Sequence, residues 1–115
     1  MSKPSVLISG VGGDIGQSVA RALIGDFQIL GCDMEDGASS RLFVEKFFCV
    51  PPASEKTAYL KAIGDIIRRE KMDIFIPVSE AEITLLNCER KWISEIDAKV
   101  ILNNQKALGI FLDKL

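Results

Sequence analysis

The chain has 115 residues, a formal net charge of -2 at pH 7, 48% hydrophobic and 26% charged residues, and no histidine. This length and composition predict one globular domain with a single core, and exclude a second domain, a disordered chain, His-containing zinc sites and Ser-His-Asp triads. Acidic and basic residues are interspersed, and no segment approaches the roughly 18 apolar residues of a membrane span, so neither nucleic acid nor a membrane is an expected partner.

A glycine-rich stretch near the N-terminus organises the predicted fold. The apolar run at residues 6–9 is followed by four glycines and then by a helical pattern, which indicates a strand, a tight turn and a helix. Gly10, Gly13 and Gly16 stand at a spacing of three, which permits a sharp turn and close packing of the helix on its strand. N–H groups at the helix start would then face a crevice suited to an anionic or polar ligand. Ile15 occupies a position where the strict dinucleotide spacing requires glycine, so a ligand-facing loop and a purely structural turn are equally favoured.

The rest of the chain alternates between apolar runs and helical patterns. Further strands are predicted at residues 27–32, 47–50, 73–78 and 99–102, and helices at 15–24, 54–71, 79–96 and after Asn104. Near-continuous apolar runs are typical of strands buried on both faces. The sequence therefore predicts an α/β fold, a Rossmann-like three-layer sandwich whose five-stranded parallel sheet has the order 3-2-1-4-5.

Local signals refine two of these helices. The first helix is expected to bury Ile15, Val19, Leu23 and Ile24 and to end at Gly25. The third helix is expected to begin with an S-x-x-E capping box formed by Ser79 and Glu82.

Three acidic residues are expected at the carboxyl edge of the sheet. In the predicted order, the glycine turn and the segment after strand 4 lie on opposite sides of one crevice. Asp14 and Glu80 reach this crevice from the two sides, although an acid in a first helical turn is also favoured by the helix dipole alone. Asp33 ends the second strand near where dinucleotide folds place a ribose-binding acid, and strand-ending aspartates also cap turns.

The three cysteines are odd in number and widely spaced. Cys32, Cys49 and Cys88 are therefore expected to be reduced thiols. The N-terminus has no signal-peptide pattern, so we expect a cytoplasmic protein. No metal site is expected.

Three short motifs together resemble the N-terminal domain of ATP-grasp ligases. They are Gly13-Asp14-Ile15-Gly16, the strand-end run at residues 75–82, and Asp113-Lys114. The resemblance covers essentially the whole chain and is closest to the branch of the carbamoyl-phosphate-synthase large chain. Biotin carboxylases and formate-dependent phosphoribosylglycinamide transformylases are also similar. The resemblance implies that substrate lies between the glycine loop and the loop after strand 4.

The resemblance also implies roles for single residues. It places Gly13, Asp14 and Glu80 in contact with substrate and Lys114 in contact with a nucleotide phosphate, and it makes no residue of this chain catalytic. The family needs a further ATP-grasp unit whose phosphate loop and magnesium-binding carboxylates are absent from this sequence. Residues 1–115 are therefore expected to be the pre-ATP-grasp domain of a longer chain, inactive by itself and without a cofactor of its own.

The parent enzyme implied by the resemblance uses ATP and magnesium to activate a carboxylate as an acyl phosphate, which a nitrogen nucleophile attacks. The expected partners are a small-molecule substrate and the enzyme's own ATP-grasp domain. The sequence leaves open whether the protein also forms a homodimer. One alternative is the NAD(P)-binding part of an extended short-chain dehydrogenase, because residues 9–16 fit T-G-x-x-G-x-x-G with serine in place of threonine. Against it, the only tyrosine, Tyr59, has no lysine at the Tyr-x-x-x-Lys spacing. The other alternative is a non-catalytic ligand-sensing module.

Overall fold

The computed structural model describes residues 3–11, 14–34 and 44–102. All five strands pair in parallel in the order β3-β2-β1-β4-β5, so the predicted α/β Rossmann-like fold is confirmed. The elements are β1 (Ser5–Ser9), α1 (Asp14–Leu23), β2 (Gln28–Asp33), β3 (Lys46–Cys49), α2 (Lys56–Glu70), β4 (Ile74–Pro77), α3 (Glu80–Asn87), α4 (Arg90–Glu95) and β5 (Lys99–Val100).

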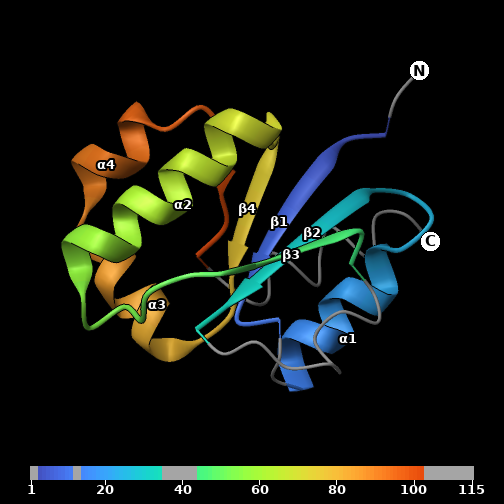
Figure 1. Ribbon diagram of the computed structural model, residues 1–115, viewed down its shortest axis with the longest axis horizontal. Coiled ribbons are helices and arrows are strands. Elements are labelled where there is room, and N and C mark those ends of the chain that lie inside the picture. The colour runs from blue at the N-terminus through green and yellow to red at the C-terminus, as the bar shows by residue number, and fades with distance from the viewer. Residues whose placement is uncertain (1–2, 12–13, 35–43, 103–115) are drawn as a thin grey trace.

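Helices cover both faces of the sheet. Figure 1 shows α1 on one side of the strands and α2, α3 and α4 on the other. Side chains alternate along the central strand β1, so that Val6 and Ile8 pack in the cluster that contains α1 residues, whereas Leu7 packs in the cluster that contains α2 residues. The sheet is therefore the middle layer of three.

Helix α1 buries a narrower stripe than predicted. Its buried residues are Gly16, Val19, Ala20 and Leu23, which recur at the spacing of one helical face. Ile15 and Ile24 flank this face on either side and are 52% and 54% exposed, so their predicted burial is wrong. The predicted end of the helix is confirmed, because Gly25 has a φ of 95°, the left-handed conformation that glycine adopts after a helix.

The helix predicted over residues 79–96 forms as two helices. The break lies at Cys88 and Glu89, whose N–H groups donate to carbonyls three positions earlier, the tighter pattern with which helices often end. Cys88 is a weak helix former, so local propensity offers little resistance to the break. In the second helix Trp92 packs edge-on against Phe75 of β4, with the ring centroids 6.5 Å apart.

Strand β5 pairs only at Lys99 and Val100, which is shorter than predicted. The helix predicted after Asn104 lies outside the described residues. The three cysteines are free thiols, as predicted, with Cys32 buried and the other two exposed. Within the part of the chain that the structure describes, no helix is long and apolar enough to cross a membrane.

Candidate functional site

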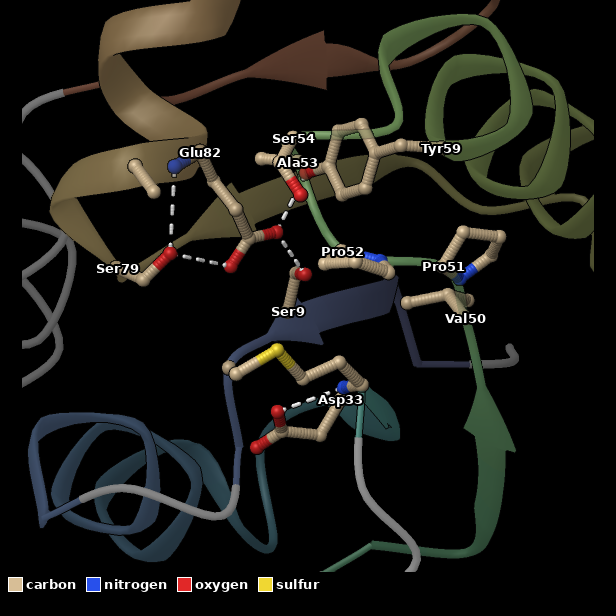
Figure 2. Close-up of a pocket in the computed structure, with 13 residues that line it drawn as sticks. Ser9, Asp33, Val50, Pro51, Pro52, Ala53, Ser54, Tyr59, Ser79 and Glu82 are labelled. Atoms are coloured by element: carbon tan, nitrogen blue, oxygen red, sulfur yellow. Dashed lines mark hydrogen bonds between the residues drawn. The ribbon is translucent and has the colours of Figure 1, made fainter.

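A cavity of about 250 Å³ opens at the carboxyl edge of the sheet (Figure 2). The ends of β1 and β2, the segment after β3, and helices α2 and α3 supply its walls. This is the edge at which open α/β sheets bind ligands, next to the point where the strand order reverses. The lining residues are Ser9, Gly10, Asp33, Met34, Val50, Pro51, Pro52, Ala53, Ser54, Tyr59, Ser79, Ala81 and Glu82.

The glycine turn folds back onto the end of β2. Gly10 has a φ of 80°, and a Cβ atom added there would lie 2.9 Å from Cγ2 of Val78, so the turn needs glycine at this position. The N–H groups of Gly10 and Val11 donate to the Cys32 carbonyl, at 2.9 and 3.2 Å. The N–H groups of these two residues therefore hold the turn against the neighbouring strand. They precede α1, so the prediction that N–H groups at the helix start face a ligand stays a prediction.

Helix α1 lies against the same turn. A Cβ atom added to Gly16 would lie 2.4 Å from the carbonyl oxygen of Gly10 and 2.7 Å from Cα of Val11. Such distances are far below van der Waals contact, so the backbone of α1 approaches the backbone of the turn as closely as glycine permits. This glycine has the packing role that the spacing of three predicted.

A buried carboxylate forms the α3 side of the cavity. Glu82 is only 7% exposed and accepts hydrogen bonds from the hydroxyls of Ser9, of Tyr59 at 2.5 Å and of Ser79 at 2.8 Å. Figure 2 shows the three hydroxyls converging on this carboxylate from β1, α2 and the start of α3. Among the described residues no lysine or arginine lines the cavity, so hydroxyl donors replace a cation as partners of the buried charge. We call Ser9, Tyr59, Ser79 and Glu82 the hydroxyl–carboxylate cluster.

The sequence predicts only a helix-capping role for Glu82. One half of that prediction is confirmed, because Ser79 is the N-cap and its Oγ accepts the N–H of Glu82 at 3.3 Å. The carboxylate, however, binds the Ser79 hydroxyl and also reaches across to β1 and α2. Sequence reasoning missed this cluster because its hydroxyl donors lie in separate elements, and no spacing along the chain links them.

Burial is the largest of the effects that raise the pKa of Tyr59 above its ordinary value of 10.0. The charge of the neighbouring Glu82 carboxylate and the hydrogen bond to it act in the same direction. Burial likewise raises the pKa of the Cys32 thiol, with further contributions from the Glu82 and Asp33 carboxylates. Both side chains are therefore neutral in the folded chain at neutral pH.

We expect Tyr59 to ionise only when the chain unfolds. Because its pKa is higher in the folded state, the unfolded chain loses this proton first, and the free energy of unfolding falls as pH rises above about 10. Tyr59 is the only tyrosine, so tyrosinate absorbance reports on it alone. In an alkaline titration the absorbance change and the loss of circular dichroism should coincide. Ionisation of Cys32 on unfolding adds to the same pH dependence of the free energy of unfolding. Tyr59→Phe should remove only the part of this dependence that comes from the tyrosine. Tyrosinate absorbance in a chain that is still folded would contradict the assignment.

The sequence-predicted acids differ in their relation to the cavity. Asp14 and Glu80 are the first residues of α1 and α3, both are exposed, and neither lines the cavity. Asp33 does line it, and its Oδ1 accepts the N–H of Met34 at 2.7 Å. Gly13 and Lys114 lie outside the described residues.

Comparison with known proteins assigns the sequence to a protein family. The sequence matches the family model described as PylC-like, N-terminal domain, over residues 6–101. No curated protein matches the sequence.

Several solved structures resemble the fold. Glycinamide-RNase-transformylase T from Mycobacterium tuberculosis has a TM-score of 0.63 and 17% identity, over 90% of this chain and 30% of that chain. A short chain dehydrogenase family protein from Francisella tularensis has a TM-score of 0.56 and 14% identity, over 85% and 48% of the two chains. N5-carboxyaminoimidazole synthetase from Staphylococcus aureus has a TM-score of 0.52 and 19% identity, over 87% and 26%. Identities this low show a shared fold alone, and the chain spans less than half of each of these proteins.

Proposed function

Because the chain belongs to the PylC-like N-terminal domain family of ATP-grasp ligases, we propose that it supplies part of the acceptor-substrate site of an ATP-dependent ligase. In the proposed reaction a carboxylate is activated as an acyl phosphate, and a nitrogen nucleophile attacks it. The cavity at the carboxyl edge of the sheet carries this proposal, since it lies where open α/β sheets bind small molecules. Its volume of about 250 Å³ suits a small substrate or one end of a larger one.

The chain acts in this proposal as the pre-ATP-grasp domain of a cytoplasmic enzyme and does not catalyse alone. ATP and magnesium bind mainly to an ATP-grasp domain that follows it, and Lys114 contacts a nucleotide phosphate. That ATP-grasp domain is the chain's principal partner, because it brings the acyl phosphate to the acceptor substrate. The narrower likeness to the carbamoyl-phosphate-synthase branch stays a prediction.

Asp14 and Glu80 hold the amine-bearing or otherwise cationic part of the acceptor. Both are exposed first residues of helices that follow central strands of the sheet, so both stand at its carboxyl edge. A bound ammonium would interact favourably with both negative charges and would be oriented toward the acyl phosphate. Neither carboxylate needs to act as a general base.

Neutralising either acid should therefore weaken acceptor binding selectively. In the complete ligase, Asp14→Asn or Glu80→Gln should raise KM for the acceptor substrate by about tenfold, the loss of one hydrogen bond to a charged group, with ATP affinity unchanged. The free energy of unfolding should fall by less than about 1 kcal/mol, the limit set by a helix-terminal charge. Steady-state kinetics and urea denaturation measure the two effects.

Glu95→Gln is the matched control. It removes an exposed acid at the end of α4, the helix that leads into β5 and so ends at the opposite edge of the sheet. KM should not change in this variant. If Asp14→Asn and Glu80→Gln instead cost about 1 kcal/mol or more of stability with unaltered KM, the two acids are helix-terminal charges and the assignment fails.

The second candidate function is NAD(P) binding. It is favoured by Asp33, which lines the cavity at the end of β2, and by the dehydrogenase-like structural neighbour. The glycine turn argues against it, because Ile15 stands where the strict dinucleotide spacing requires glycine. The ligase reading therefore ranks first.

A further inference from the structure

We propose that the hydroxyl–carboxylate cluster binds the protonated amine of a small aliphatic ligand inside the cavity. The inference rests on the proposed function, since it adds a second, deeper amine site to the one assigned to Asp14 and Glu80 on the same substrate. Ser9, Tyr59 and Glu82 are buried side chains of β1, α2 and α3, and Ser79 is the partly buried N-cap of α3. They are distinct from the exposed acids at the two helix starts.

The direction of the hydrogen bonds determines what the cluster offers a ligand. An ionised carboxylate only accepts hydrogen bonds, so the Ser9, Tyr59 and Ser79 hydroxyls each commit their single proton to Glu82. The Ser79 oxygen also accepts the N–H of Glu82. The lone pairs that face a ligand are therefore those of Tyr59 and, shared with the neighbouring Cys32 thiol, those of Ser9, beside a full negative charge. This wall of the cavity accepts hydrogen bonds and does not donate them.

The remaining walls of the cavity are mostly apolar and favour the hydrocarbon part of a ligand. Val50, Pro51, Pro52 and Ala53 follow the edge strand β3 and line the cavity, and Met34 adds a thioether. The two prolines have no N–H to donate. Since no lysine or arginine is among the described lining residues, an anionic group would meet no cationic side chain there and would face the Asp33 and Glu82 carboxylates. An ammonium on a short methylene chain would meet complementary groups on both sides.

The test is a nuclear magnetic resonance titration of the 115-residue chain with three probes of equal chain length: n-butylammonium, butyrate and n-butanol. We expect butylammonium to shift the amide resonances of Gly10, Tyr59 and Glu82 and to bind about tenfold more tightly than either other probe, because only it makes charge-assisted hydrogen bonds to the cluster. Equal or tighter binding of butyrate, or shifts confined to residues outside the cavity, would overturn the proposal.

Glu82→Gln separates recognition from a merely structural role. The amide keeps the shape of the side chain, but its NH₂ group can donate to the Ser9 and Tyr59 oxygens and so turn their protons toward the cavity. Butylammonium binding should weaken about tenfold and the preference over butyrate should disappear. A structural Glu82 would leave the ratio of the two affinities unchanged.

Two further variants complete the test. Tyr59→Phe removes one acceptor from the cavity and should weaken butylammonium several-fold, which keeps the proposal testable if the glutamine variant does not fold. Ser54→Ala is the matched control, because Ser54 lines the cavity outside the cluster and its loss should leave all three affinities unchanged. An equal loss in the Ser54 variant would refute the assignment.

The outcomes also distinguish this site from the proposed function. If butylammonium does not bind, but KM of the complete ligase still depends on Asp14 and Glu80, the cluster is not an amine site, whereas the ligase function and its two exposed acids stand. If butylammonium binds as expected and the complete protein forms no product with ATP, the cluster stands and the ligase function fails.

Discussion

Gly16→Ala is expected to lower the free energy of unfolding by about 3 kcal/mol, although alanine is intrinsically the better helix former. The added methyl group would lie 2.4 Å from the carbonyl oxygen of Gly10 and 2.7 Å from Cα of Val11. Both are backbone atoms of the β1–α1 turn, so no side-chain rotation relieves the clash. The helix must move away from the turn and lose part of its packing on the sheet.

Gly64→Ala is the matched control for this prediction. Gly64 is also a buried helical glycine, but the nearest atom to an added Cβ there is a guanidinium nitrogen of Arg68, at 3.5 Å. Without a clash the helix propensity of alanine should raise the free energy of unfolding by about 0.5–1 kcal/mol. Urea denaturation followed by circular dichroism measures both variants. If both glycine substitutions shift stability equally, the close approach of α1 to the turn is refuted.

Phe75→Ala should destabilise the chain by about 3–5 kcal/mol, the range for a fully buried phenylalanine. Phe75 has no exposed surface and lies on β4, with β1 on one side and β5 on the other. Its ring packs in the cluster beneath α2 and α3 and against the edge of Trp92. Truncation leaves a cavity that rigid neighbours on several elements cannot fill.

Phe48→Ala is the corresponding control on the sheet's edge. Phe48 is only half-buried on β3, and the guanidinium of Arg69 lies 5.6 Å from the centre of its ring. Its loss should cost about 1 kcal/mol, because solvent and neighbouring side chains can occupy the space. Thermal unfolding and urea denaturation should rank the two variants in this order. A larger loss at Phe48 would contradict the placement of the core beneath the central strands.

The strands and their order in the sheet were predictable because the sequence patterns that indicate them are local. Apolar runs of strand length, separated by helical patterns, admit few parallel arrangements once crossovers are right-handed and connections are short. The ending of α1 at Gly25 and the Ser79 cap of α3 were predictable for the same reason, since each depends on backbone geometry within a few residues. The break between α3 and α4 was missed, because apolar residues continue at helical spacing on both sides of it.

The cavity and its acidic centre depended on contacts between distant parts of the chain. Ser9 and Tyr59 are separated from Glu82 by 73 and 23 positions, and both donate to the same carboxylate. In the sequence each of the three residues has an ordinary local explanation: a strand end, a helix face and a helix cap. Asp14 and Glu80 are more conspicuous in the sequence, yet they lie outside the cavity lining. Burial of Glu82 arises only when α2 and α3 pack on β1, because that packing removes water and leaves the hydroxyls as the donors that stabilise its charge.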